Sequence, residues 1–115
     1  MEHQFILSGA STKEERYREF LSQFESLVRD VDDEIAVLAN AAAALCEAFG
    51  FFWVGFYRVK GDCLILGPFQ GSVACYRIKK GKGVCGTAWE QGHTIVVPDV
   101  DKFPGHIACS SLSRS

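Results

Sequence analysis

The stretch that decides the fold is FFWVGFYRVKGDCLIL, residues 51–66, because the hydrophobic pattern changes where it begins. Residues 51–59 are rich in aromatic and β-branched side chains, a composition typical of a strand. The sequence Lys60-Gly61-Asp62 predicts a turn, and residues 63–66 predict a second strand beside the first. The stretch therefore predicts a hairpin.

Two amphipathic helices are predicted before this hairpin, at residues 13–29 and 34–49. Apolar side chains recur at helical spacing along one face of each segment. Thr12, followed three residues later by a glutamate, has the spacing of a capping box at the start of the first helix. The acidic run 30–33 can cap the second helix, and Gly50 is suited to end it.

The chain after the hairpin predicts shorter elements. Gly67-Pro68 is expected to end the second strand. The predicted elements that follow are a third strand at 72–78, a mobile basic loop at 79–83, a short helix at 84–91 and a fourth strand at 93–97. Two helices followed by strands of antiparallel character indicate an α+β domain, with the N-terminal helices packed on one face of the sheet.

The domain organisation follows from length and element count. We expect residues 1–11 to form a flexible N-terminal arm and residues 12–115 to form a single domain. Four short strands cover too little of two large amphipathic helices. The domain is therefore expected to be incomplete at its C-terminus.

Composition excludes several classes of partner. A net charge of −2 does not favour nucleic acid or an acidic membrane surface. The sequence has no apolar run that would span a bilayer, and its N-terminus lacks the pattern of a signal peptide. We therefore expect a cytoplasmic protein. In that reducing compartment, five cysteines indicate metal binding, catalysis or burial rather than a disulfide framework.

Three of the five cysteines lie within residues 67–109, and each has small or flexible neighbours. Small neighbours open the space around a sulfur, which a substrate or a second sulfur needs in order to approach. We therefore predict that Cys75, Cys85 and Cys109 form a redox-active thiol site. The alternative is that all three are small buried hydrophobes.

Five motifs carry a resemblance to a known family. They are WVGFY (53–57), LGPFQG (66–71), AC-x-RI (74–78), G-x-GVCGTA (81–88) and GHIAC (105–109). In this order they resemble the free methionine-(R)-sulfoxide reductases, GAF-fold enzymes that reduce the sulfoxide of the free amino acid. The resemblance is close over residues 53–109 and extends in general layout to the two preceding helices. It implies a GAF-like α+β fold. Chains of the family continue past the position of Ser115, with further strands, a terminal helix and the acidic residues that hold the substrate's amino group.

The resemblance implies a role for each cysteine of the trio. Cys109, in GHIAC, would be the nucleophile that attacks the sulfoxide sulfur and becomes a sulfenic acid as methionine leaves. A second thiol would condense with it to an intramolecular disulfide, which thioredoxin would reduce. Both Cys85 and Cys75 are candidates for this resolving thiol. We favour Cys85, because Gly83 and Gly86 give it backbone freedom and a helix N-terminus would lower its pKa.

Two aromatic residues are candidate substrate contacts. Trp53 and Tyr57 are four residues apart, which places them on the same face of a strand. The resemblance assigns both to the substrate pocket, where their rings would contact the S-methyl group. Core packing is the alternative, and it is the one that the residues alone favour.

The histidines and cysteines give little support for a metal site. His93 and His106 could join the cysteine trio around zinc, but the spacings are wide and no CxxC pair is present. We expect no metal and no bound cofactor, with thioredoxin as an external reductant. His106 could instead tune Cys109. No motif includes Cys46 or Cys63, so packing is the interpretation for both.

Two other functions are kept as alternatives to the reduction of free L-methionine-(R)-sulfoxide. One is a non-catalytic GAF-type module that binds a small ligand; against it, the sequence lacks an Asn-Lys-x-x-x-Phe-x-x-x-Asp-Glu signature and a Cys-His dipeptide. The other is an inactive, truncated remnant. A homodimer is a further expectation, because an unfinished sheet leaves an edge for pairing.

Overall fold

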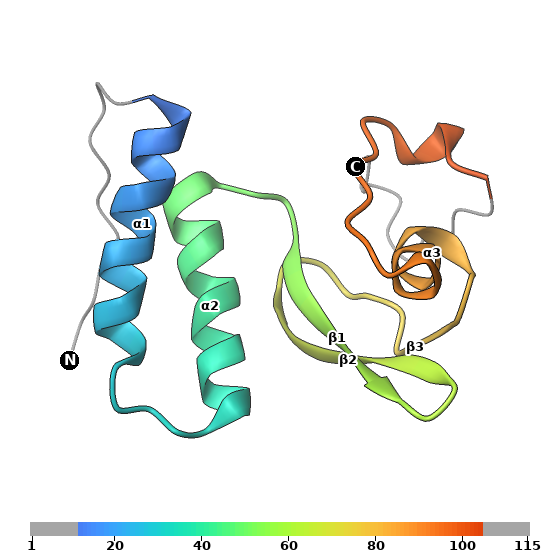
Figure 1. Cartoon of the computed structure of the whole chain (residues 1–115), viewed down its shortest axis with the longest axis horizontal. Coiled ribbons are helices and arrows are strands. Elements are labelled where there is room, and N and C mark those ends of the chain that lie inside the picture. The colour runs from blue at the N-terminus through green and yellow to red at the C-terminus, as the bar shows by residue number, and fades with distance from the viewer. Residues whose placement is uncertain (1–11, 105–115) are drawn as a thin grey trace. The chain divides into compact units, whose positions relative to one another are not determined.

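The computed structural model describes residues 12–104. The elements of this part of the chain, shown in Figure 1, are α1 (Lys13–Val28), α2 (Glu34–Phe49), β1 (Val54–Lys60), β2 (Cys63–Gln70), β3 (Arg77–Lys79), α3 (Gly83–Gln91) and the 3-10 helix η1 (Val100–Lys102). The three strands form one sheet in the order β1-β2-β3. The α+β class is confirmed. The predictions for residues 1–11, His106 and Cys109 lie outside the described residues.

The chain divides into two compact units, which are described separately. The first contains α1, α2, the start of β1 and Pro68–Gly71. The second contains Tyr57–Gly67 and, from Ser72 onward, β3, α3 and η1. The packing of the helices on one face of the sheet and the single domain over 12–115 stay predictions.

The two long helices begin and end where the local signals predict. The hydroxyl of Thr12 accepts a hydrogen bond from the backbone N–H of Glu15 at 3.2 Å, and the carboxylate of Asp33 accepts one from the N–H of Ala36 at 2.9 Å. Each bond satisfies a backbone donor that the first helical turn leaves without a partner. Gly50 ends α2 in the left-handed conformation, at φ 69°.

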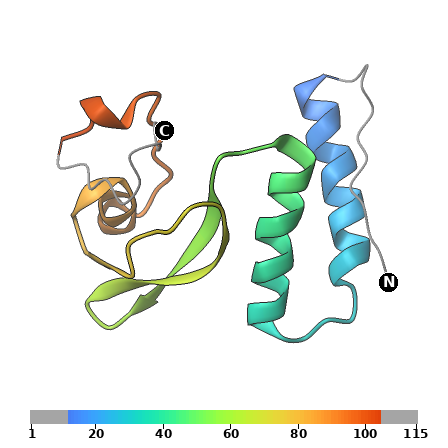
Figure 2. The same ribbon diagram turned by 180° about the vertical axis from the view of Figure 1, so that it is seen from behind.

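Aromatic rings join α1 to α2, which lie side by side in Figures 1 and 2. Phe20 and Ala44 are the buried centre of this cluster, with 7% and 2% of their surfaces exposed. The ring of Phe49 lies 5.5 Å from that of Phe20 and 5.1 Å from that of Tyr17. These two helices and their ring contacts are called the helix pair below.

The sheet begins with the predicted hairpin, because only Gly61 and Asp62 separate β1 from β2. Gly61 has a φ of +63°, as the first central residue of a two-residue hairpin turn often does. The second pairing, β2 with β3, is antiparallel, with Leu64 opposite Ile78. Leu64 and Ile78 are both buried and form part of the core of the second unit.

All four strand predictions differ from the structure in extent or existence. The first strand begins at Val54 and not at residue 51, so Trp53 lies outside it. Strand β2 continues through Gly67 and Pro68 instead of ending there. Because β3 pairs only with residues 63–65 of β2, Pro68 lies where that side of β2 has no partner in β3, and proline is tolerated there. The third strand is limited to β3, three residues long. Residues 93–97, the predicted fourth strand, are irregular, and no strand among residues 12–104 pairs with them.

Helix α3 packs on β3 at Gly86. A β-carbon at this position would lie 2.5 Å from the backbone oxygen of Lys79, so a larger residue could not approach as closely. Two backbone hydrogen bonds constrain the loop 79–83, which was predicted to be mobile. The N–H of Lys82 donates to that same oxygen of Lys79 at 3.1 Å. The N–H of Gly81 donates to the oxygen of Gly86 at 2.9 Å.

Candidate thiol site

Tyr57 links strand β1 to the segment that contains Cys75. It lies in β1, and its hydroxyl donates a hydrogen bond of 2.8 Å to the backbone oxygen of Cys75. Cys75 lies in the irregular segment 71–76 that connects β2 to β3. Cys85 lies in the first turn of α3, as the sequence predicted. Sequence patterns did not reveal the bond to Cys75, since a backbone oxygen has no residue-type signal.

The pKa of the same hydroxyl is influenced by Cys85. Desolvation raises the pKa of Tyr57, and the negative charge of a Cys85 thiolate raises it further. Tyr57 is therefore hydrogen-bonded to the backbone of one predicted thiol residue, Cys75, and its pKa is influenced by a second, Cys85. The third, Cys109, lies outside the described residues.

The pKa of Cys85 moves in the direction opposite to the prediction. The residue as a whole is exposed, but neighbouring atoms around its sulfur desolvate the thiolate and raise the pKa of the thiol. The expected lowering by the N-terminus of α3 does not prevail. A raised pKa leaves less thiolate at neutral pH, so Cys85 is a poor candidate for an activated nucleophile.

The cysteines of the described residues differ in bonding. Cys75 is disulfide-bonded, whereas Cys46, Cys63 and Cys85 are free thiols. Cys63 is buried, with its sulfur 3.7 Å from the backbone oxygen of Lys60. The sulfur of Cys46 lies 3.7 Å from the backbone oxygen of Phe51. Both thiols are therefore weak donors to nearby carbonyls.

Trp53 precedes β1 and belongs to the first unit. Its ring stacks on Phe69, with centroids 5.5 Å apart and planes 19° apart. It also covers two glycines, because a β-carbon on Gly55 or on Gly71 would overlap the indole ring. The shared role of Trp53 and Tyr57 as walls of a substrate pocket stays a prediction.

His93 is exposed and follows α3, with Nδ1 3.0 Å from the backbone oxygen of Thr94. Within residues 12–104, no group of three or more His, Cys, Asp or Glu side chains is arranged to hold a metal ion. In the same part of the chain, no helix has the length and apolar character required to cross a bilayer.

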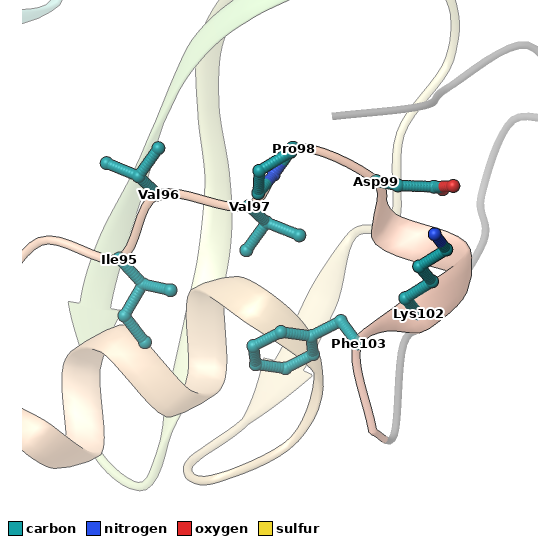
Figure 3. Close-up of a pocket in the computed structure, with 7 residues that line it drawn as sticks. All are labelled: Ile95, Val96, Val97, Pro98, Asp99, Lys102 and Phe103. Atoms are coloured by element: carbon teal, nitrogen blue, oxygen red, sulfur yellow. The ribbon is translucent and has the colours of Figure 1, made fainter.

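An apolar hollow of about 440 Å³ lies elsewhere in the second unit. Its lining consists of Ile95, Val96, Val97, Pro98, Asp99, Lys102 and Phe103. In Figure 3 the ring of Phe103 points toward the 95–97 segment, while Asp99 and Lys102 lie at η1. Of the predicted thiol and substrate residues that the structure describes, none lines this hollow, and the sequence had indicated only a strand at 93–97.

Comparison with known proteins gives several strong similarities. The chain is 61% identical over 105 residues to GAF domain-containing protein A of Dictyostelium discoideum, covering 90% of this chain and 66% of that protein. It is 43% identical over 104 residues to free methionine-R-sulfoxide reductase of Escherichia coli, covering 90% of this chain and 63% of that protein. No family model matches the chain.

A solved structure agrees with these relatives. It is that of free methionine-R-sulfoxide reductase from Neisseria meningitidis in complex with its substrate, with a TM-score of 0.91 and 59% sequence identity. The match covers 98% of this chain and 68% of that one. The chain thus spans about two thirds of the length of the relatives that it matches.

Proposed function

Because the chain belongs to the free methionine-(R)-sulfoxide reductase family, we propose that it reduces free L-methionine-(R)-sulfoxide to methionine. The observation that supports this most is the 59% identity to the Neisseria enzyme, whose structure holds its substrate. The second support is the hydrogen bond from the Tyr57 hydroxyl to the backbone oxygen of Cys75, together with the influence of Cys85 on the pKa of that hydroxyl.

The proposed first step takes place at Cys109. Its sulfur attacks the sulfoxide sulfur, the oxygen passes to the cysteine, and methionine is released. The thiol becomes a sulfenic acid, so the cysteine sulfur is oxidised by two electrons and the substrate sulfur is reduced by two. Trp53 and Tyr57 are our proposed contacts for the S-methyl group.

The proposed second step forms a disulfide. A resolving thiol attacks the sulfenic acid sulfur, and the oxygen leaves as water. We assign this role to Cys75 rather than to Cys85, which the surrounding glycines had favoured. The support is that Cys75 is disulfide-bonded in this structure, while Cys85 is a free thiol with a raised pKa. A dithiol reductant of the thioredoxin class then returns both cysteines to thiols and is itself oxidised to a disulfide.

Turnover of the pure sulfoxide tests this proposal. We expect methionine to form from the free (R)-sulfoxide with thioredoxin and its reductase, and Cys109→Ser to lower the rate by at least about a hundredfold, since no other group replaces the nucleophile. Cys46→Ser is the matched control, because Cys46 lies in α2 with its thiol on a backbone oxygen. Methionine formation that is absent from the unsubstituted chain, or equal in it and in Cys109→Ser, would contradict the proposal.

Substitution of Cys75 or Cys85 tests the resolving role separately from the role of the nucleophile. Cys75→Ser is expected to release about one methionine per chain and then stop, because the sulfenic acid has no thiol partner. Cys85→Ser is expected to continue turning over. The reverse result would return the resolving role to Cys85.

A further inference from the structure

Tyr57 has a second feature besides its aromatic ring, namely a hydroxyl bonded to the peptide of the proposed resolving cysteine. The donor and acceptor are 2.8 Å apart, the bond is partly buried, and 18 residues separate the two partners in sequence. A bond of this length is a good hydrogen bond, and it joins a regular strand to an irregular segment.

Side-chain packing does little to hold that segment in place. The two largest apolar side chains near Cys75 are mostly in solvent, since Val73 is 78% exposed and Tyr76 is 83% exposed, while Ala74 and Cys75 are half-buried. Few buried contacts leave a segment free to move unless hydrogen bonds hold it. In the reduced chain, in which Cys75 has no disulfide, hydrogen bonds of the backbone are therefore important for the position of Cys75.

Two backbone oxygens of the segment accept hydrogen bonds from the neighbouring strands. The Tyr57 hydroxyl holds the oxygen of Cys75, and the N–H of Leu66 in β2 holds the oxygen of Tyr76 at 3.0 Å. The second anchor is a backbone bond that any residue at position 66 other than proline can make. The first depends on one side-chain oxygen.

We propose that Tyr57 is a positioning residue for disulfide formation: its hydroxyl fixes the Cys75 peptide and so presents the Cys75 sulfur to the sulfenic acid. This rests on the proposed function, in which Cys75 is the resolving thiol. A disulfide forms only within a narrow geometry, with the two α-carbons about 4.4–6.8 Å apart. An anchor that narrows the range of positions of Cys75 speeds the second step of the reaction rather than the first.

The test separates the two steps in a single turnover. The reduced chain is mixed with the free (R)-sulfoxide. Methionine release and disulfide formation are then followed by mass spectrometry, with a reagent that traps the sulfenic acid. We expect Tyr57→Phe, which keeps the ring, to lower the rate of disulfide formation relative to methionine release by about fivefold. This corresponds to about 1 kcal/mol at 1.4 kcal/mol per tenfold, the net contribution of one hydrogen bond. More trapped sulfenic acid is expected in parallel.

Tyr76→Phe is the matched control, since Tyr76 adjoins Cys75 and its side chain is exposed. It should leave the ratio of the two rates unchanged. A double-mutant cycle adds a readout that a general structural role would not change. In a Cys75→Ser background, Tyr57→Phe should have no further effect on the lifetime of the sulfenic acid. An unchanged ratio in Tyr57→Phe, or an equal loss in Tyr76→Phe, would overturn the proposal.

A second oxidant distinguishes failure of this inference from failure of the proposed function. If the unsubstituted chain releases no methionine, the proposed function fails, and hydrogen peroxide is used to form the sulfenic acid with loss of water. Slower disulfide formation at Cys75 in Tyr57→Phe would then still support the positioning role. Equal rates in the two proteins, or no disulfide at Cys75 in either, would overturn it.

Discussion

The contacts inside the helix pair differ in kind from the contacts inside the second unit. Rings of α1 and α2 meet around Phe20, whereas α3 meets β3 through Gly86, whose Cα lies against a backbone oxygen. A ring can be replaced by a smaller apolar side chain that keeps part of the contact. A glycine against a carbonyl has no smaller substitute. Tolerance to substitution therefore depends on the kind of contact as much as on burial.

The largest effect is expected in the helix pair. Phe20→Ala should lower the free energy of unfolding by about 3 kcal/mol, because it removes a ring that is 7% exposed and contacts Phe24 and Phe49. Phe20→Leu should cost only about 1 kcal/mol, since most of the volume remains. Urea unfolding followed by circular dichroism measures both. Equal losses in the two variants would contradict the graded tolerance described for rings.

The next largest loss of stability is expected from substitution of Gly86 in the second unit. Gly86→Ala should cost about 2 kcal/mol, because its β-carbon overlaps the oxygen of Lys79 and α3 must move. Gly92→Ala is the matched control: Gly92 ends α3 at φ 73° with no atom within 4 Å of an added β-carbon, so only backbone strain of about 1 kcal/mol is expected. The same urea experiment compares them. A smaller loss for Gly86→Ala than for Gly92→Ala would remove the steric argument.

The smallest effect concerns the pH dependence of one thiol. Desolvation raises the pKa of Cys85 in the folded chain, so its alkylation rate should reach half of its maximum at a higher pH than in urea-unfolded chain. The reagent is iodoacetamide, and mass spectrometry follows the peptide that contains Cys85. A lower midpoint in the folded chain would mean that the N-terminus of α3 outweighs desolvation after all.

Sequence patterns were most accurate where the signal is local. Asp33 and Gly50 mark the two ends of α2 because an N-cap and a left-handed C-cap each involve only the adjacent turn. The predicted strands at 72–78 and 93–97 were less accurate, since a strand exists only beside a partner. Alternation of side chains does not reveal that partner.

Predictions for the candidate site were likewise more accurate where the signal is local. The family motifs grouped Cys75 with Cys85, and this grouping stays a prediction, although Tyr57 is hydrogen-bonded to the backbone of Cys75 and its pKa is influenced by Cys85. The pKa of Cys85 was predicted in the wrong direction, because a helix N-terminus is visible in sequence and the atoms that desolvate a sulfur are not. The bond from Tyr57 to a backbone oxygen was missed for a similar reason.

The tryptophans have a practical consequence for spectroscopy. The chain has two, and each belongs to a different unit: Trp53 stacks on Phe69 in the first, and Trp89 lies under the ammonium group of Lys80, 5.1 Å from its ring, in the second. Replacing either one by phenylalanine leaves a single indole fluorophore. The emission of each variant then reports the melting of one unit alone, and coincident transitions would show that the two units unfold cooperatively.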